Sequence, residues 1–452
     1  MNDATPPRRS LRLEGILALL PASDALRPLL DHLVETSRPD PARRWSVGGE
    51  LGTAGTRLVD MDGLRETGVS VARTEARRVE RHLQRAVAVI AAAAEGRGEG
   101  VVEALLEEVG ALEGEGRLED ARAWAEAAVR ETFASGSSRG GEALRLAARC
   151  ARGLGDLQAA RSLYEEAHLR SLALGRRVDA VIAATGRGNV AVDQGRWEEA
   201  EEWYGKALTL IEEGSAALPP AEARGLRWRL YQNLGITHRE RGAFDSAEGW
   251  YRRAAETSGA AETSGAAGVE VRDPAAGVEV ENGWGQLELA RGELRKAELR
   301  FRRALAALGT GRGGEGSVAV RVNLGEALLR QGRTLEAGEV GREAEAEALR
   351  GGWLRRVPEI YRLLADVAHA RGEPEAFVFL DRALALVRER GLPPYEEALT
   401  LETLAGLRDA EGEVEAGADA REAARQIFRR LGVRLDPNED HRSSRKGEGD
   451  EP

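Results

Sequence analysis

Apolar residues recur three and four positions apart along most of this chain, which is the spacing of one face of an α-helix. Residues 228–255 show the pattern most clearly, because it divides there into two stretches. The apolar and small positions are Tyr231, Leu234, Gly235 and His238 in the first stretch, and Ala247, Tyr251 and Ala254 in the second. Gly242 lies between them, where a helix that ends favours a residue able to adopt left-handed backbone. The stretch therefore predicts a hairpin of two helices.

The same pattern recurs along the chain. The turn glycines are Gly116, Gly155, Gly195, Gly242, Gly292, Gly332, Gly372 and Gly412, and the last three intervals, counted from Gly292, are of 40 residues. Second-helix positions follow them at Ala160, Tyr164 and Ala167, at Ala200, Tyr204 and Ala207, at Ala297, Phe301 and Ala304, and at Ala337, Gly341 and Ala344. One hairpin cannot bury its apolar face alone, so a regular series of hairpins predicts a stacked array of about eight units.

The order of an aromatic residue, Leu-Gly, an aromatic residue, and then Ala-x3-aromatic resembles the tetratricopeptide repeat (TPR). The resemblance implies an all-α fold, a TPR-like α-solenoid in which helical hairpins form a right-handed superhelix. We expect the solenoid over residues 101–433, preceded by a poorly defined region of short helices and loop at 1–68 and a helix at 69–100. A charged, disordered tail is expected at 434–452.

Two features outside the regular hairpins need interpretation. The helix predicted over 69–100 is amphipathic and arginine-rich, and it is either a surface for an acidic partner or membrane, or the capping helix of the solenoid, which we favour. Two longer intervals between turn glycines predict insertions at 212–225 and 255–280. The second insertion contains duplicated segments, which favours a surface loop that tolerates change.

Composition narrows the possible partners. The net charge of −11 opposes generic attraction to nucleic acid, and lysine is so rare beside arginine that arginine content reflects a GC-rich, bacterial codon usage. No apolar run is long enough to cross a membrane, so we expect no membrane partner. The single cysteine, Cys150, fits a reducing compartment, and we expect a cytoplasmic protein.

Catalytic and cofactor signatures are not evident. The sequence contains no phosphate-binding P-loop, no His-Glu-x-x-His and no Cys-x-x-Cys, and its acidic pairs fit solvated helix faces. We therefore predict no enzyme activity, no cofactor and no metal site.

The resemblance implies that a peptide or protein partner binds in a concave groove lined by the first helices. Transferred onto this sequence, the groove positions are Arg145, Arg149, Asn189, Arg229, Gln232, Asn233, Arg239, Asn282, Gln286 and Asn323. Four of the six asparagines in the chain lie among them, although asparagine is a poor residue for a helix interior. We expect the side chains of Arg229 and Asn233 to face solvent in the free protein, and arginine and asparagine together favour an acidic extended segment as the ligand.

Two functions fit this reading. The first is a protein-interaction adaptor or scaffold that holds a peptide or protein in the groove. The alternative is the ligand- or peptide-sensing arm of a bacterial signalling or transcription-regulatory system, with residues 1–68 contacting the output partner.

Overall fold

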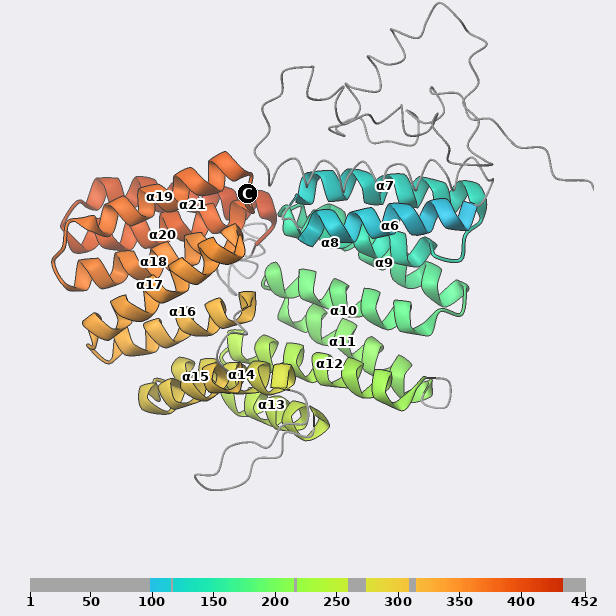
Figure 1. The fold of residues 1–452 in the computed structure, drawn as a ribbon, viewed down its shortest axis with the longest axis horizontal. Helices are drawn as coiled ribbons and strands as arrows, with labels where there is room; N and C mark the ends of the chain where they lie inside the picture. Colours follow the sequence, from blue (N-terminus) through green and yellow to red (C-terminus); the bar gives the residue numbers. More distant parts are fainter. Residues whose placement is uncertain (1–97, 115–116, 215–217, 259–273, 309–313, 434–452) are drawn as a thin grey trace, which may run out of the picture. The chain divides into compact units, whose positions relative to one another are not determined.

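A computed structural model describes residues 98–433, with gaps at 115–116, 215–217, 259–273 and 309–313 (Figure 1). The predicted regions 1–68, 69–97 and 434–452 lie outside the described residues. Within the described residues every regular element is a helix. The helices are α6 (Gly98–Gly114), α7 (Leu118–Ser135), α8 (Gly140–Gly153), α9 (Leu157–Ala173), α10 (Arg177–Asp193), α11 (Trp197–Glu213), α12 (Pro220–Glu240), α13 (Phe244–Ser258), α14 (Pro274–Ala290), α15 (Leu294–Leu308), α16 (Glu315–Arg330), α17 (Thr334–Gly351), the 3-10 turn η1 (Leu354–Arg356), α18 (Val357–Ala370), α19 (Glu375–Arg390), α20 (Pro394–Ala410) and α21 (Val414–Leu431).

The described residues form two compact units. Unit 1 contains residues 98–151 and Leu169–Leu174, and unit 2 contains Arg152–His168 and the residues from Gly175 onward. In unit 1, α6 packs against α7. In unit 2 each even-numbered helix from α10 to α20 packs against the odd-numbered helix that follows it, and each hairpin packs on the next. The fold is therefore the predicted series of stacked helical hairpins.

The turn glycines end the first helices as predicted. Gly155, Gly195, Gly242, Gly292, Gly332, Gly372 and Gly412 all have left-handed backbone, with φ between 68° and 83°. After α12, the N–H of Gly242 donates to Arg239 O at 2.9 Å and the N–H of Ala243 donates to His238 O at 2.8 Å. These bonds satisfy carbonyls that a helix end otherwise leaves unpaired. The eighth predicted glycine, Gly116, lies outside the described residues.

Aromatic rings of the second helices lie directly on glycines of the first helices. A Cβ atom added at Gly188 would lie 2.4 Å from Cε1 of Tyr204, and one added at Gly235 would lie 2.5 Å from Cε1 of Tyr251. Tyr251 is 1% exposed, and its ring also faces Gly283 of the next hairpin, at 3.0 Å from the corresponding position. Each ring therefore fills space that exists only because the facing first helix has no side chain at that point.

The same contact recurs within a hairpin between Phe301 of α15 and Gly285 of α14, at 2.5 Å. Tyr164 of α9 instead meets Gly186 of α10, the first helix of the next hairpin, at 2.3 Å. The hairpin α16–α17 differs because Gly341 occupies the aromatic position. Here Leu364 of α18 approaches the Cβ position of Gly341 to 2.7 Å and fills the space from the next hairpin. A position that looks degenerate in sequence is thus compensated by a neighbouring helix.

Both predicted insertions are shorter than the sequence suggested. Helix α12 begins at Pro220, so residues 220–225 extend a first helix instead of forming a loop. Pro219 and Pro220 explain the start, because proline is well suited to the first turn of a helix and cannot lie in its interior. Helix α13 continues to Ser258 and α14 begins at Pro274, so the described parts of the second predicted insertion are helical and only 259–273 lie outside the described residues.

The ring-on-glycine contact predicts that Gly→Ala substitutions at two helical glycines change the free energy of unfolding in opposite directions. Gly235→Ala should lower the free energy of unfolding by about 1 to 3 kcal/mol, because the added methyl group overpacks the Tyr251 ring. Gly205→Ala, at an exposed position of α11 with no atom within 4 Å, should raise it by about 0.5 to 1 kcal/mol through helix propensity. Urea titration of both variants measures the difference. Equal effects at the two positions would contradict the packing role of Gly235.

Candidate protein-interaction face

The first helices α10, α12, α14 and α16 contact one another in succession within unit 2. We call the surface that carries their predicted groove residues the first-helix face. Amide side chains link these helices in pairs. Asn233 Nδ2 donates to Asn189 Oδ1 at 3.0 Å, and Asn323 Nδ2 donates to Asn282 Oδ1 at 2.9 Å. The four asparagines of the first helices are thus two interhelical pairs.

Each pair leaves polar groups unused. Asn189 Oδ1 also accepts from the Tyr204 hydroxyl at 2.7 Å, which occupies both of its lone pairs. Asn189 Nδ2 and Asn233 Oδ1 make no hydrogen bond to described residues, and neither atom is buried. The second pair likewise leaves Asn282 Nδ2 and Asn323 Oδ1 available. Each pair therefore presents one amide donor and one carbonyl acceptor, which is the complement of a peptide group.

The predicted arginines have different environments. Arg239 donates to Gln286 on the next first helix, and Arg149 of unit 1 donates to Glu113 Oε1 at 2.6 Å. Arg145 is half-buried in α8. Arg229 is exposed and forms no ion pair with described residues. It is therefore the cation of the first-helix face that is most available to a ligand.

The amide side chains of the predicted set are less exposed than Arg229, and Asn233, which we expected to face solvent, is half-buried. Gln232 is 8% exposed, and its Oε1 lies 3.3 Å from the position that a Cβ at Gly283 would occupy. It packs between α12 and α14, because Gly283 leaves room for it there. Asn189, Asn233, Asn282 and Asn323 are half-buried for a related reason, since they bond across the interface between first helices.

The sequence reasoning missed two residues at this face. Asp193 accepts from Arg152 Nε at 2.5 Å, and it follows Asn189 by four residues, which places both on one side of α10. This helical spacing could have found it. Tyr204 was assigned to packing alone, but its buried hydroxyl also orients Asn189. Nothing in the spacing distinguishes these two roles of one tyrosine.

Acidic residues occur farther along, on α16 and α18. Burial, and after it the negative charge of Glu326, raise the pKa of Asp366 to about 6, while His369 and Arg362 act in the opposite direction. Because the folded-state pKa is higher than the ordinary value of 3.8, the folded protein binds a proton at Asp366 before the unfolded chain does. Stability contributed by this group therefore falls as pH rises through about 6.

We expect Asp366→Asn to raise the melting temperature at about pH 8, where wild-type Asp366 is ionised and poorly solvated. The advantage should shrink as the pH falls below about 6 and should approach zero only near and below about pH 4, where the carboxyl is protonated in the folded protein and increasingly in the unfolded chain. Glu326→Gln in the wild-type background should give a smaller gain with the same pH dependence. Thermal melts at both pH values check this. An advantage of Asp366→Asn that did not change with pH would rule out the raised pKa.

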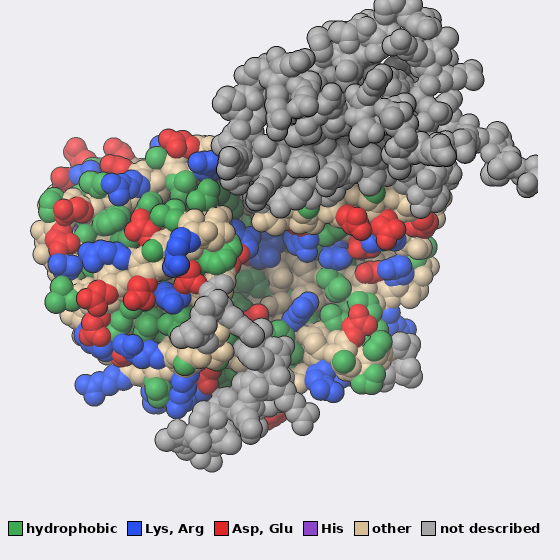
Figure 2. Space-filling view, viewed as in Figure 1, with side chains coloured by type: hydrophobic (Ala, Val, Ile, Leu, Met, Phe, Trp, Pro, Cys, Tyr) green, Lys and Arg blue, Asp and Glu red, His purple; other side chains and the backbone are tan. Residues whose placement is uncertain are grey.

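The described part of residues 98–433 contains no candidate metal site, membrane-spanning helix or reactive thiol. No group of three or more His, Cys, Asp or Glu side chains there could hold a metal ion, and no helix there has the length and apolarity to cross a bilayer. Burial raises the pKa of the Cys150 thiol to about 12, which keeps it protonated and unreactive at neutral pH. On the face drawn in Figure 2, positive and negative side chains are interspersed rather than gathered by sign.

The geometry defines an α-solenoid of helical hairpins joined by ring-on-glycine contacts. Models of the tetratricopeptide repeat match residues 141–213, 229–261 and 282–352. The chain is a tetratricopeptide repeat protein. No curated protein matches its sequence.

Solved structures share the fold at low identity. A Rap protein complexed with Competence and Sporulation Factor is 12% identical with a TM-score of 0.51, and the match covers 73% of this chain and 98% of that one. The Rap conjugation gene regulator of the plasmid pLS20, in complex with the Phr peptide, is 14% identical with a TM-score of 0.50, covering 69% and 77%. A tetratricopeptide repeat protein from Parabacteroides merdae is 16% identical with a TM-score of 0.39, covering 73% and 98%.

Proposed function

We propose that this protein is a non-catalytic interaction scaffold that holds an extended peptide segment of a partner against the first-helix face. The observation that carries the proposal is the pair of asparagine bridges. Each bridge fixes two side chains by one mutual hydrogen bond and leaves a donor and an acceptor exposed. An extended backbone presents the matching carbonyl and N–H groups at every residue.

The mutual hydrogen bonds matter for affinity as well as for geometry. A side chain that is already ordered in the free protein loses little conformational entropy when a ligand binds. The Tyr204 hydroxyl contributes to this order, because it donates to the same Oδ1 atom of Asn189 that accepts from Asn233. The face is therefore preorganised for backbone recognition, and this recognition places few demands on the ligand's side chains.

The charge of the ligand is set by the residues beside the amides. Exposed Arg229 favours an acidic residue in the bound segment, as the sequence predicted. The fold is shared by the Rap regulator in complex with the Phr peptide, and this supports a peptide as the occupant. The sensing-arm hypothesis uses the same occupant and differs only in its output partner, so a cytoplasmic bacterial regulator remains our second prediction.

Two conservative substitutions test the asparagine donors selectively. Asn189→Asp and Asn282→Asp keep the Oδ1 atom that accepts from Asn233 or Asn323 and replace only the unused amide donor by a carboxylate oxygen. Each variant should weaken binding of an extended peptide by about 1 to 3 kcal/mol, because a peptide carbonyl loses its donor. The change in melting temperature should be small.

The probe is an array of extended peptides of matched length with acidic, neutral or basic side chains, followed by calorimetry on the best binders. Arg229→Ala should remove the preference for acidic peptides and reduce the salt dependence of binding. Arg382→Ala, at an exposed position of the second helix α19, is the matched control and should bind like wild type. Wild-type affinity in both asparagine variants, with folding intact, would exclude the first-helix face as the peptide site.

A further inference from the structure

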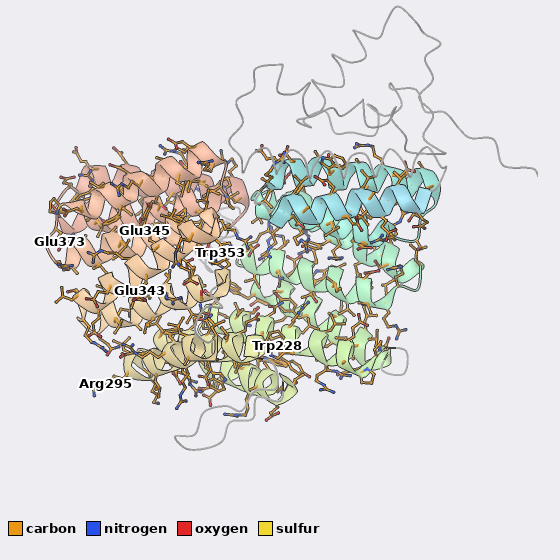
Figure 3. The ribbon with its side chains drawn as sticks, viewed as in Figure 1. Trp228, Arg295, Glu343, Glu345, Trp353 and Glu373 are labelled. Carbon is orange, nitrogen blue, oxygen red and sulfur yellow. The ribbon has the colours of Figure 1, made fainter. Side chains whose placement is uncertain are left out.

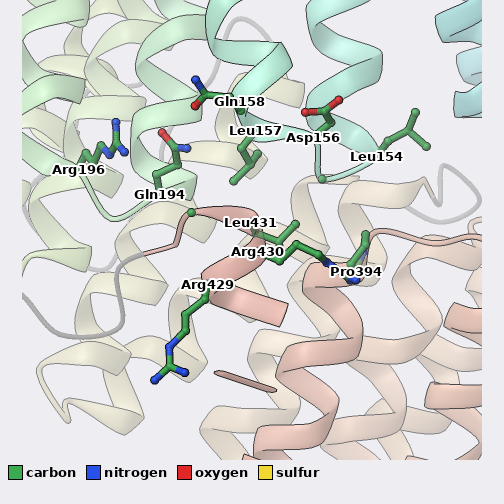
Figure 4. Close-up of a pocket in the computed structure, with 12 residues that line it drawn as sticks. Leu154, Asp156, Leu157, Gln158, Gln194, Arg196, Pro394, Arg429, Arg430 and Leu431 are labelled. Atoms are coloured by element: carbon green, nitrogen blue, oxygen red, sulfur yellow. The ribbon is translucent and has the colours of Figure 1, made fainter. Parts of the chain in front are cut away.

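A cavity of about 420 Å³ lies within unit 2, where the last described hairpin meets earlier turns (Figure 4). Its first wall comes from the start of α9 and the turn between α10 and α11. Its second wall comes from the start of α20 and the end of α21. The walls touch at Gly155, where an added Cβ would lie 3.1 Å from Pro394 Cδ and 3.2 Å from Leu431 Cδ2. The volume is in the range of small-molecule sites.

A buried polar side chain lacks a partner in this cavity. Gln194 lines it and is 2% exposed, yet its Oε1 atom is buried and accepts no hydrogen bond. Gln194 is held by its position, because it caps α10 and its Nε2 lies 3.3 Å from the Cβ position of Gly432 on the opposite wall. Leaving such an acceptor without a hydrogen bond is unfavourable, so a ligand that supplies a donor at this point would be favoured.

The charged lining is predominantly positive. Arg196 comes from the first wall, and Arg429 and Arg430 come from the second (Figure 4). Arg196 pairs through Nη1 with Glu199 Oε2 at 3.5 Å, although its buried Nε has no hydrogen-bond partner, and Arg429 pairs with Glu422 at 3.6 Å. Arg430, in contrast, is exposed and forms no ion pair among the described residues. The one lining carboxylate, Asp156, accepts at Oδ1 from the N–H of Ala159 in the first turn of α9. The cavity therefore suits an anion.

We propose that this cavity is a second binding site, distinct from the first-helix face, for a small organic anion that also carries a hydrogen-bond donor. The anionic group pairs with Arg430, and the donor bonds Gln194 Oε1. Because Arg430 and Gln194 come from opposite walls, the bound anion bridges the α20–α21 hairpin to the α10–α11 turn. Binding then stabilises the contact between Leu431 and Gly155.

Two matched pairs of probes distinguish a carboxylate ligand from a phosphate ligand, and within each pair they test whether a hydroxyl donor strengthens binding. L-Malate and succinate differ by one hydroxyl, and glycerol 3-phosphate and propyl phosphate differ chiefly by hydroxyls. Calorimetry on the full-length protein should detect millimolar or tighter binding of a hydroxylated member. It should bind about 10-fold more tightly than its partner without hydroxyls, as expected for one hydrogen bond to a buried acceptor. A site for carboxylates should bind L-malate and succinate more tightly, and a site for phosphates should bind glycerol 3-phosphate and propyl phosphate more tightly.

Two variants test the proposed ligand contacts separately, one at the Gln194 acceptor and one at the Arg430 cation. Gln194→Met removes the acceptor at similar volume and should abolish the preference for the hydroxylated probe. Arg430→Gln, at an exposed position, should weaken both members of the preferred pair by about 10-fold or more. Arg342→Gln, an exposed arginine on α17, is the control and should bind like wild type. In wild type the preferred probe should also slow hydrogen exchange over residues 428–433.

The proposal is overturned if wild type binds none of the four anions, or if Arg430→Gln binds them as wild type does. Loss of binding in Arg342→Gln equal to that in Arg430→Gln would overturn it too, because it would show a general charge effect. Peptide binding at the first-helix face is measured separately on the same variants. Its retention in Arg430→Gln is expected, so failure of one site is distinguishable from failure of the other.

Discussion

The contact between an aromatic ring on a second helix and a glycine on a first helix is the constraint on which the rest of this structure depends. At Gly188, Gly235 and Gly285 a methyl group would lie within 2.6 Å of the facing ring, so helix packing at each point requires both partners. The Tyr251 ring also reaches Gly283 in the following hairpin. One ring thus joins two helices within a hairpin and links that hairpin to the next, which is how a chain of local units becomes continuous.

Close approach of the first helices has a second consequence, because it brings short amide side chains within reach of one another. Asn189 and Asn233 can bond only if α10 and α12 lie close together. The same packing that stabilises the array therefore orders the polar groups that we propose recognise a peptide. Charged residues also lie on the second helices, where the labelled Arg295 in Figure 3 extends outward from the start of α15.

The sequence predicted the helical hairpins well because glycine, alanine and aromatic positions report local packing directly. Gly242 must end a helix and Tyr251 must fill a gap, whatever the remainder of the chain does. The pairing of Asn282 with Asn323 was not predicted, since it depends on the register between helices 41 residues apart in sequence. The cavity near Gln194 depends on packing accumulated over several hairpins, which no single motif encodes. Residues 220–225 were misassigned because the longer interval between glycines indicated an insertion without showing that it is helical.

Native-state hydrogen exchange on wild type and Tyr251→Ala tests the central claim most directly. Removing this ring should lower local stability by about 3 to 5 kcal/mol, as truncation of a buried aromatic side chain does. Protection should fall in α12, α13 and α14, which the ring contacts, and should persist in α18 to α21. A uniform loss throughout unit 2 would instead show one cooperative bundle, and unchanged protection in α14 would show that the ring does not link neighbouring hairpins.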